Sequence, residues 1–508
     1  MNYLLRNLRI PVGEELGLEL AVSRKLGMPA TAFSIVQILR KALDTRRKGH
    51  PIWDYSLELS FPDTEFSHKD ILPYKVDSWP EFPIKQIPDN PVIIGMGPAG
   101  LFAALALVER GFKPRIYDQG FDLGTRAVHV KDFWEKGDLR EDSNVQFGEG
   151  GAGAFSDGKL TSRGNNPVIS RIYELLIEFG ASPNIAYEAL PHCGTEGIRG
   201  IVSGIREYLL TKGASISYGA KLTDLEITDG RLRRIRINAD WEDCHTMILA
   251  LGNSARDTFR MLAKRDLAME AKDFAVGFRI EHSQAQINRA IYGKEKWAEA
   301  LGAATYRLAS GNVYSFCMCP GGEVIASSSA SGSVVTNGMS YSARAGAYCN
   351  SAIVTPVDKQ VFGSRLFDGM DYQKIIEEKS FYAGYYAPAQ KIEDFMHGQC
   401  SENKFFTTYK PGYVPHDLSQ IYPNRQTELI KSSLQKFNDI VHDFTRNAVL
   451  IAPETRTSCP VRIIRDKTLL SSPGCKDIYP VGEGSGYAGG IISSAADAYK
   501  TASTFFLR

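Results

Sequence analysis

The pattern of apolar and polar positions changes along the chain, and its first part indicates a small N-terminal unit. "WDYSLELSF" (53–61) predicts a strand because its apolar residues recur at every second position, and "YLLRNLRIPV" (3–12) is a further candidate strand. "FSIVQILRKALDTRRK" (33–48) predicts a helix, because Ile35, Ile38, Leu39 and Leu43 follow helical spacing. Prolines at 80, 83, 88 and 91 then indicate a linker. We therefore expect an α+β domain over 1–88, and we consider a ferredoxin-like fold for it.

The next segment, Pro91–Gly120, has the pattern of a β–α–β unit. Val92–Ile94 is a short apolar strand, apolar residues with helical spacing follow it, and "RIYD" predicts the next strand. Between the strand and the helix, Gly95, Gly97 and Gly100 form G-x-G-x-x-G, with Pro98 and Ala99 inside the motif. Asp118 stands 18 residues after Gly100, before Gln119. This context predicts a site that binds the pyrophosphate and ribose of FAD or NAD, because Asp118 favours a free ribose 2′-hydroxyl over the 2′-phosphate of NADP.

A second glycine-rich stretch near the end of the chain favours FAD over NAD. "YPVGEGSGYAGGI" (479–491) predicts a strand that ends at Gly482 and Glu483, and a helix that begins near Ile491. Glu483 could accept a hydrogen bond from a ribitol hydroxyl. The amides of Gly490, Ile491 and Ile492 could face the pyrimidine edge of a flavin, where a helix N-terminus stabilises negative charge. A purely structural strand–turn–helix is the alternative.

A third signal is "TMILALGNSARDT" (246–258), a strand that leads to Ala250 and Gly252 and follows "GASISYGAKLTDLEITDGRLRRIRI" (213–237), which predicts a hairpin meander with a turn at Asp229–Gly230. Leu222, Ala250 and Gly252 are the candidate cofactor-binding residues of these segments. This order of segments resembles glutathione-reductase-type FAD proteins. "NVQFGEGGAGAFSDGKLTSR" (144–163), "SFCMCPGGEVIASSSASGSVVTNGMSYSARAG" (315–346) and "ETRTSCPVRIIR" (454–465) resemble, more closely, a bacterial family of uncharacterised NAD(FAD)-utilising dehydrogenases. Cys459 departs from the serine expected there, which argues against a catalytic use of that position.

The resemblance implies further cofactor-binding residues in the segment that approaches the flavin: Gly150, Gly151, Gly153, Ser156 and Lys159. Lys159 could lie over the flavin or bind an anionic substrate; a surface lysine is the alternative. Arg126 could reach a phosphate; an exposed helix arginine is the alternative.

The expected fold class is α/β. A Rossmann-like FAD-binding domain over 89–272 and 446–508 would carry an inserted, largely antiparallel α+β substrate domain over 273–445. The expected function is that of an FAD-dependent oxidoreductase, a dehydrogenase that moves a hydride or an electron pair between flavin and a small organic substrate. The chain shows no second dinucleotide motif, so NAD(P)H is considered only as a transient electron donor.

The candidate catalytic residues are Lys159, Arg279 and Arg456, with Glu281 and His282 as further substrate-side candidates. A cross-strand ion pair is the favoured reading of the charges in "VGFRIEH" (276–282), and His282 as a proton donor is a hypothesis. Cys317 and Cys319 form C-x-C. A strained disulfide and a flavin-facing thiol are both conceivable, but two plain buried cysteines are the favoured reading.

Composition restricts the remaining possibilities. The net charge is +1 and charged residues make up 23% of the chain, so no global field attracts nucleic acid. We expect no membrane span, no metal site and a cytoplasmic location, because the chain has no long apolar run, no visible export signal and eight scattered cysteines without zinc-ligand spacing. The runner-up function is an FAD enzyme that modifies RNA and binds it with the N-terminal unit, whose predicted helix carries Arg40, Lys41 and the basic run 46–48. A flavin-bound sensor or scaffold without turnover is a third reading.

Overall fold

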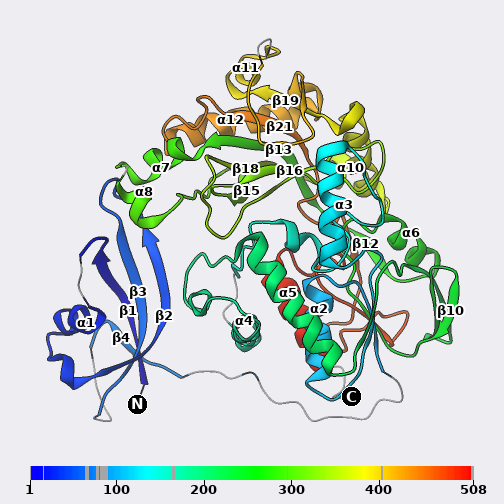
Figure 1. Ribbon diagram of the computed structural model, residues 1–508, viewed down its shortest axis with the longest axis horizontal. Coiled ribbons are helices and arrows are strands. Elements are labelled where there is room, and N and C mark those ends of the chain that lie inside the picture. Colours follow the sequence, from blue (N-terminus) through cyan, green and yellow to red (C-terminus); the bar gives the residue numbers. More distant parts are fainter. Residues whose placement is uncertain are drawn as a thin grey trace.

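A computed structural model describes residues 2–14, 17–62, 68–75, 79, 90–162, 166–294, 296–401 and 404–504 (Figure 1). The expected boundary at 88 and most of the proline-rich linker lie outside the described residues. The described part contains three groups of elements: an N-terminal unit, a domain around a parallel sheet, and a cap built on a larger sheet.

The N-terminal unit is a four-stranded antiparallel sheet in the order β2-β3-β1-β4. Its elements are β1 (Asn2–Pro11), α1 (Leu18–Leu26), β2 (Ser34–Asp44), β3 (Ile52–Ser60) and β4 (Ile71–Pro73). Because β3 lies between β1 and β2, the unit contains a split β–α–β arrangement, in agreement with the strand order of a ferredoxin-like fold. The described residues between β3 and β4 carry no helix, so the second helix of a complete ferredoxin-like fold is not seen there.

The helix predicted over 33–48 is wrong, because this segment forms β2. Ile35 pairs with Leu59 and Ile38 pairs with Leu57, so residues three apart on β2 face residues two apart on β3. Bulges between Ile35 and Gln37 and between Ile38 and Arg40 insert the extra residues. Because of the bulges, the apolar residues of β2 that face β3 are spaced in the sequence like those on one side of a helix.

The second group is a five-stranded parallel sheet in the order β23-β11-β5-β6-β7. Its strands are β5 (Val92–Ile94), β6 (Arg115–Tyr117), β7 (Ser215–Ser217), β11 (Met247–Leu249) and β23 (Ile478–Pro480). Its helices are α2 (Pro98–Val108), α3 (Leu123–Lys136), α4 (Pro167–Glu178), α5 (Gly194–Thr211), α6 (Arg256–Lys264) and α13 (Ile491–Thr504). A meander of β8 (Leu222–Thr228), β9 (Arg231–Ile237) and β10 (Asp240–Asp243) joins β7 to β11. Its turn at Asp229–Gly230 agrees with the prediction, whereas the start of the predicted meander contains β7, which belongs to the parallel sheet.

Helix α2 lies at the centre of this domain. Ten of its eleven residues are buried, and it packs against α13, at the other end of the chain. A helix that is apolar on every side is stable only when other elements surround it. The contact between α2 and α13 brings the two glycine-rich segments of the sequence to the same end of the sheet.

The cap is built on a seven-stranded sheet in the order β14-β15-β18-β13-β21-β19-β20. Its strands are β13 (Phe274–Ser283), β14 (Ala309–Ser310), β15 (Val313–Cys319), β18 (Tyr348–Val357), β19 (Ala387–Lys391), β20 (Tyr413–Pro415) and β21 (Val449–Glu454). Neighbouring strands are antiparallel except for the parallel pair β19–β20. Two further pairs complete the strands: β16 (Glu323–Ala326) with β17 (Thr336–Met339), and β12 (Met269–Ala271) with β22 (Val461–Ile463). The cap helices are α7 (Gln284–Tyr292), α8 (Lys296–Leu301), α9 (Lys359–Phe362), α10 (Asp368–Lys379), α11 (Ile392–His397) and α12 (Asn424–Ile440).

One expected boundary needs correction. The sequence prediction assigned residues from 446 onward to the nucleotide domain, but β21 pairs with β13 and β19 inside the cap sheet. The chain rejoins the parallel sheet only at β23, from Ile478. All residues of β21 are buried, and an apolar run of this kind does not reveal which sheet it enters.

The cap sheet has two different faces. Phe278 and Ile280 of β13 pack with α12 in one apolar cluster. On the other face, Arg279 and Asn350 are buried, and Ile451 packs in the cluster that also contains α2 and α13. This second face therefore looks toward the domain of the parallel sheet, with hairpin β16–β17 between them.

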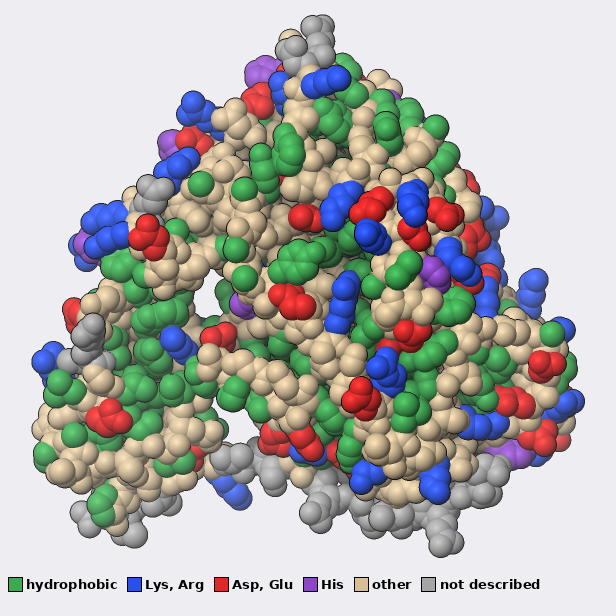
Figure 2. All heavy atoms as spheres, viewed as in Figure 1, with side chains coloured by type: hydrophobic (Ala, Val, Ile, Leu, Met, Phe, Trp, Pro, Cys, Tyr) green, Lys and Arg blue, Asp and Glu red, His purple; other side chains and the backbone are tan. Residues whose placement is uncertain are grey.

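The N-terminal unit contacts both larger parts. The Lys41 N–H donates to the Tyr187 carbonyl over 2.8 Å, and Trp297 Nε1–H donates to the Gly49 carbonyl over 3.1 Å. Figure 2 shows basic and acidic side chains intermixed on the face that it displays. In the described part of the chain, no helix has the length and apolar character needed to cross a membrane.

Candidate functional site

The glycines of the two predicted motifs lie together at the C-terminal edge of the parallel sheet. Gly151 approaches Gly97 so closely that a Cβ on Gly151 would lie 3.1 Å from the Gly97 Cα. A Cβ on Gly153 would lie 3.4 Å from Ile491 Cδ1, and a Cβ on Gly482 would lie 2.7 Å from Ala99 Cβ. We call this group, Gly97–Ala99, Gly150–Gly153, Gly482 and Ile491, the glycine cradle.

Three glycines of the first motif have separate physical roles. Gly95 has φ +101°, and a Cβ there would lie 2.4 Å from the Ala250 carbonyl oxygen. A Cβ on Gly100 would lie 1.9 Å from the Gly95 carbonyl oxygen, so both positions need glycine for packing. Gly97 is different: its φ is −76°, and the nearest atom to a Cβ would be the Gly151 Cα at 3.7 Å. The space beside Gly97 is therefore not required by the protein's own packing.

Glu483 stands at the end of β23, two strands from β5. Asn253 Nδ2 donates to Glu483 Oε1 over 2.9 Å. Burial raises the pKa of Glu483 to about 7, against the opposing effect of the Asn253 hydrogen bond. Gly490 is exposed at the start of α13, and Ile492 is buried. Glu483 is thus a half-buried carboxyl group that changes charge near neutral pH.

Asp118 is buried at the end of β6. Its carboxylate accepts hydrogen bonds from the Met96 N–H and the Gly120 N–H, both over 2.8 Å. The Ala220 N–H, two residues before Leu222, donates to the Asp118 carbonyl over 2.8 Å. Burial raises the pKa of Asp118, against these backbone hydrogen bonds. The Asp118 carboxylate therefore stabilises the turn after β5 through hydrogen bonds within the protein. Gln119 beside it is partly exposed.

Arg126 differs from both readings of its sequence. The side chain is fully buried, so the exposed helix arginine is wrong. Its Nε donates to the Asn144 carbonyl over 2.8 Å, and its two terminal nitrogens donate to the carbonyls of Val145 (2.8 Å) and Glu149 (2.6 Å). The guanidinium therefore holds the loop 144–149, which leads into the cradle, instead of pointing to an open phosphate site.

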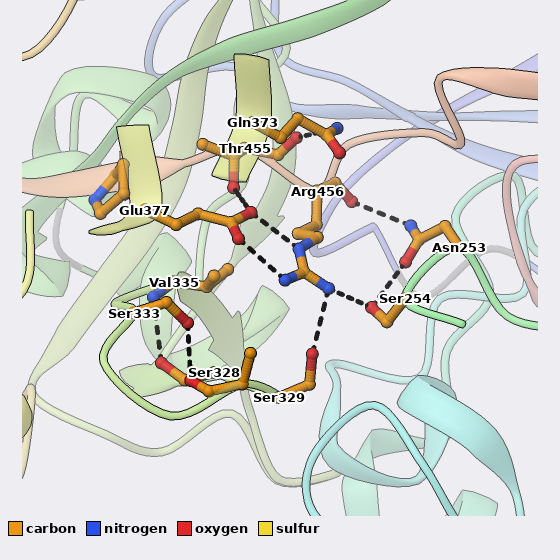
Figure 3. Close-up of polar contacts among 12 residues, drawn as sticks. Asn253, Ser254, Ser328, Ser329, Ser333, Val335, Gln373, Glu377, Thr455 and Arg456 are labelled. Atoms are coloured by element: carbon orange, nitrogen blue, oxygen red, sulfur yellow. Dashed lines mark hydrogen bonds and ion pairs between the residues drawn. The ribbon is translucent and has the colours of Figure 1, made fainter. Parts of the chain in front are cut away.

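Arg456 lies at the centre of a polar cluster between the cap and the parallel-sheet domain (Figure 3). Its Nε and one terminal nitrogen donate to the two carboxylate oxygens of Glu377 over 2.8 and 2.9 Å. The other terminal nitrogen donates to Ser254 Oγ over 2.5 Å and to Ser329 Oγ over 3.1 Å. Arg456 therefore connects α10, the turn after β11 and the segment after β16.

Glu377 has a second arginine partner. Arg256 donates to both of its carboxylate oxygens, over 2.8 and 3.0 Å. Thr455 Oγ1 donates to Glu377 Oε1 over 2.7 Å. Burial raises the pKa of Glu377, but Arg456 and Arg256 outweigh it and lower the pKa to about 2. The group, which we call the Glu377 cluster, keeps one net positive charge at neutral pH.

Arg279 belongs to a second polar cluster, on the cap face that looks toward the cradle. The side chain is fully buried; it pairs with Glu454 over 3.3 Å, and its Nε donates to Asn350 Oδ1 over 2.8 Å. This ion pair crosses from β13 to β21, which confirms the favoured reading of Arg279. Burial raises the pKa of Glu454 to about 7 despite the opposing charge of Arg279.

Lys159 enters the same region from the segment after the cradle. Its Nζ lies 2.9 Å from Asp157 Oδ2, and Asp157 also pairs with Arg344. Burial opposes the charge on Lys159, but Cys319, Cys317 and Asp157 outweigh this effect and raise the pKa of Lys159. Ser156 Oγ donates to the Gly153 carbonyl over 2.8 Å, so its hydroxyl stabilises the cradle loop. Lys159 therefore belongs to an interdomain cluster, and the surface-lysine alternative is wrong.

His282 and Glu281 have other roles. His282 Nε2 lies 2.8 Å from the Phe444 carbonyl, and burial lowers the pKa of His282 to about 4, so the ring is neutral at physiological pH. Thr408 donates to the Glu281 carboxylate through its N–H and its hydroxyl. Both residues line a cavity of about 440 Å³ together with Tyr348, Phe405 and Phe406. His282 as a proton donor therefore lacks support.

Gln373 also belongs to the Glu377 cluster, because it accepts a hydrogen bond from Arg256 over 3.2 Å and donates to the Thr455 carbonyl over 2.8 Å. Sequence reasoning missed Asn253, Ser254, Arg256, Gln373 and Glu377. The first three follow the end of β11, where polar residues after a parallel strand are a usable signal. Gln373 and Glu377 lie on α10, and nothing in the polar helix around them distinguishes these two from exposed residues. Among the described residues, no cluster of His, Cys, Asp or Glu could hold a metal ion.

Similarity to known proteins follows two lines. Residues 273–457 match the family described as "FAD-dependent protein, C-terminal domain-like". The whole chain is 38% identical to an uncharacterized protein of Clostridium beijerinckii, and the similarity covers 98% of this chain and 97% of that protein. The chain belongs to the family of this clostridial protein. The family assignment includes the N-terminal unit, because nearly the full length aligns.

Several solved structures are similar at low scores. CtdE in complex with FAD is 11% identical and covers 82% of this chain and 84% of its own, with a TM-score of 0.32. L-Amino acid deaminase from Proteus myxofaciens in complex with anthranilate is 11% identical, with coverages of 85% and 92% and a TM-score of 0.34. Halogenase PltM is 11% identical, with coverages of 82% and 68% and a TM-score of 0.36. At these scores none of them carries an argument about the present chain.

Proposed function

We propose that this protein binds FAD in the glycine cradle and is an oxidoreductase that acts on a small organic substrate. The observation that carries the proposal is the close meeting of the segments around Gly97, Gly151 and Gly482, with space beside Gly97 that the protein's packing does not need. The match of residues 273–457 to a family described as FAD-dependent supports the same cofactor independently. The finer designation as a dehydrogenase rests on the resemblance alone.

The residues present fit such a cofactor. The N-cap of α2 is Gly97, so no side chain covers the first N–H groups of the helix, and these groups attract phosphate. Asp118 and Leu222 would border the adenosine half, and Glu483 and Ile491 the opposite half. FAD would supply the redox chemistry itself.

The chain's own residues would then bind and orient the substrate. The Glu377 cluster carries one net positive charge beside Ser254 and Ser329, which suits an anionic group of a substrate. The pKa values of Glu454 and Glu483, about 7, suit carboxyl groups that hold or release a proton near neutral pH. Arg279 would keep Glu454 oriented.

The test begins with the purified full-length protein. We expect a yellow protein that releases FAD on denaturation, identified by chromatography and mass spectrometry. Apoprotein should bind FAD more tightly than FMN or NAD in calorimetric titration. A colourless protein that refuses added FAD ends the proposal. Anaerobic mixing with NADH, NADPH and a panel of metabolites should then bleach the flavin with at least one of them, whereas a flavin that stays oxidised with all favours the sensor or scaffold reading.

The RNA-acting alternative gains no support. Its basic segment lies on β2 and in the turn after it, not on a helix. Lys41 stacks over Trp53 at 4.2 Å, and Arg46 pairs with Asp44 over 2.6 Å. These contacts favour the reading of a solvated charged surface.

A further inference from the structure

Two cysteines occupy an irregular stretch of β15, at the cap face that looks toward the cradle. The register between β15 and β18 shifts between Phe316 and Cys319. Cys317 has φ +46°, in the left-handed region that residues with a side chain rarely adopt. Backbone strain of this kind persists where surrounding contacts enforce it, and it concentrates at functional sites.

The two sulfur atoms are close to each other and to two cations. Cys319 Sγ lies 3.3 Å from the Cys317 carbonyl oxygen and within hydrogen-bonding reach of the Cys317 thiol. Arg279 donates to that carbonyl over 3.0 Å and lies 3.5 Å from Cys319 Sγ. Lys159 acts on both sulfurs from the neighbouring domain. The positive charges of Arg279 and Lys159 therefore both act on the pair.

This environment separates the two thiols. The hydrogen bond from Cys319 lowers the pKa of the Cys317 thiol well below its usual value; burial opposes the shift, and Lys159 and Arg279 add to it. The same hydrogen bond and burial raise the pKa of Cys319. Cys317 is therefore the more acidic thiol of the pair, and Cys319 is the less acidic one.

Unpaired polar atoms border the same place. Glu454 Oε2 and Asn350 Nδ2 have no hydrogen-bond partner, although both residues are more than nine-tenths buried. Asn350 lies directly opposite Cys319 on β18, and the Glu454 carboxyl acts electrostatically on Cys317. Buried polar atoms of this kind normally have a partner, so a donor and an acceptor are available to a bound molecule.

We propose that Cys317 and Cys319 form a thiol–disulfide exchange site that reduces a small organic disulfide. The Cys317 thiolate attacks one sulfur of the disulfide RS–SR, the S–S bond breaks, and RS⁻ leaves. Cys319 then attacks the Cys317 sulfur of this mixed disulfide, a Cys317–Cys319 bond forms, and the second RS group leaves with the Cys319 proton as RSH. Two electrons pass from the two cysteines to the substrate. An external dithiol restores the pair.

This activity does not depend on the FAD proposal, because the step needs only the two cysteines and the two named reactants. The first experiment uses the full-length protein, reduced with dithiothreitol and desalted without oxygen. Hydroxyethyl disulfide is added, remaining thiols are alkylated after denaturation, and cysteine peptides are identified by mass spectrometry. We expect Cys317 and Cys319 to escape alkylation together, because they have formed a disulfide, while buried cysteines such as Cys244 and Cys475 are alkylated. Cys319→Ser should retain a hydroxyethylthio adduct on Cys317, and Cys317→Ser should form neither product.

The second experiment measures native alkylation by iodoacetamide and uses Cys193 as a matched control. Cys193 is half-buried like Cys317, but burial raises the pKa of Cys193 to about 11. At pH 7 Cys317 should therefore react about 100-fold faster than Cys193 in the same molecule. Lys159→Met should slow Cys317 about tenfold and move its pH profile to higher pH, and Lys159→Arg should restore both.

The pH profile reports every charged or titratable group that faces the two sulfurs: Lys159, Arg279, Asp157, Glu454 and Tyr306. Full alkylation of both cysteines after disulfide treatment overturns the proposal. Equal rates for Cys317 and Cys193 overturn it as well, and this comparison needs no variant. A mixed disulfide that persists in the unmodified protein overturns the role of Cys319.

Discussion

Alanine at position 97 separates cofactor binding from folding. Gly97 has φ −76°, and its new Cβ would meet nothing closer than the Gly151 Cα at 3.7 Å, an ordinary van der Waals distance. The lower backbone entropy of unfolded alanine favours the variant by about 0.4–1 kcal/mol, and the poorer N-cap opposes this by a similar amount. The free energy of unfolding without cofactor should therefore change by less than about 1 kcal/mol.

Binding should respond very differently. In the proposed FAD site, the added methyl group would occupy the place where the pyrophosphate approaches the backbone. Loss of one or two hydrogen bonds to a charged group costs about 1.5–3 kcal/mol, which corresponds to about a 10- to 100-fold weaker Kd for FAD. Because cofactor stabilises the folded state through its affinity, the rise in Tm on adding FAD should shrink in Gly97→Ala.

Two further glycine-to-alanine variants serve as controls, one for FAD affinity and one for stability. Gly200→Ala, on α5, adds a Cβ that meets nothing within 4 Å, so FAD affinity should not change. Gly100→Ala places a Cβ 1.9 Å from the Gly95 carbonyl oxygen and should cost about 3 kcal/mol of stability even without cofactor. Urea unfolding of apoprotein and calorimetric FAD titration measure the two quantities. Unchanged FAD affinity in Gly97→Ala refutes the assigned cradle; a large loss of apoprotein stability refutes the packing argument.

Three further predictions test the polar clusters. Glu377→Gln should lower the free energy of unfolding by about 3–5 kcal/mol at pH 7, because two arginines lose their anion, whereas the control Glu378→Gln should change it little. Since the folded pKa of Glu377 is about 2, the stability difference between the unmodified protein and Glu377→Gln should shrink only as pH falls below about 4.5 toward 2. A stability difference that stays constant in acid contradicts this prediction. Glu483 has a raised folded pKa of about 7, so the free energy of unfolding of the unmodified protein should fall by roughly 3 kcal/mol relative to that of Glu483→Gln as pH rises from about 4.5 to 7. Urea unfolding at a series of pH values measures this difference, and parallel pH curves for the two proteins contradict the raised pKa. Arg126→Met should cost about 3 kcal/mol and speed amide hydrogen exchange across 144–150, whereas unchanged exchange there denies that Arg126 holds the loop.

Local sequence patterns identified the elements that do not depend on distant partners. The strand Val92–Ile94, the start of α13 at Ile491 and the hairpin turn at Asp229–Gly230 agree with the structure, because strand and helix periodicities and turn residues act over a few positions. The same local reading failed on β2. Its bulges depend on pairing with β3, and a period taken from one strand cannot contain the register of its partner.

What the sequence alone determined is the local strand–turn–helix around the first glycine motif, since Gly100 is required by its contact with the Gly95 carbonyl oxygen in the same turn. Only the tertiary structure decided where the charges go. Arg126 donates hydrogen bonds to the loop 144–149, and β21 pairs within the cap sheet. Glu377 forms ion pairs with two arginines from segments more than 75 positions away. Burial makes an ion pair necessary but does not select its partner, because partner choice follows from the packing of whole elements against one another.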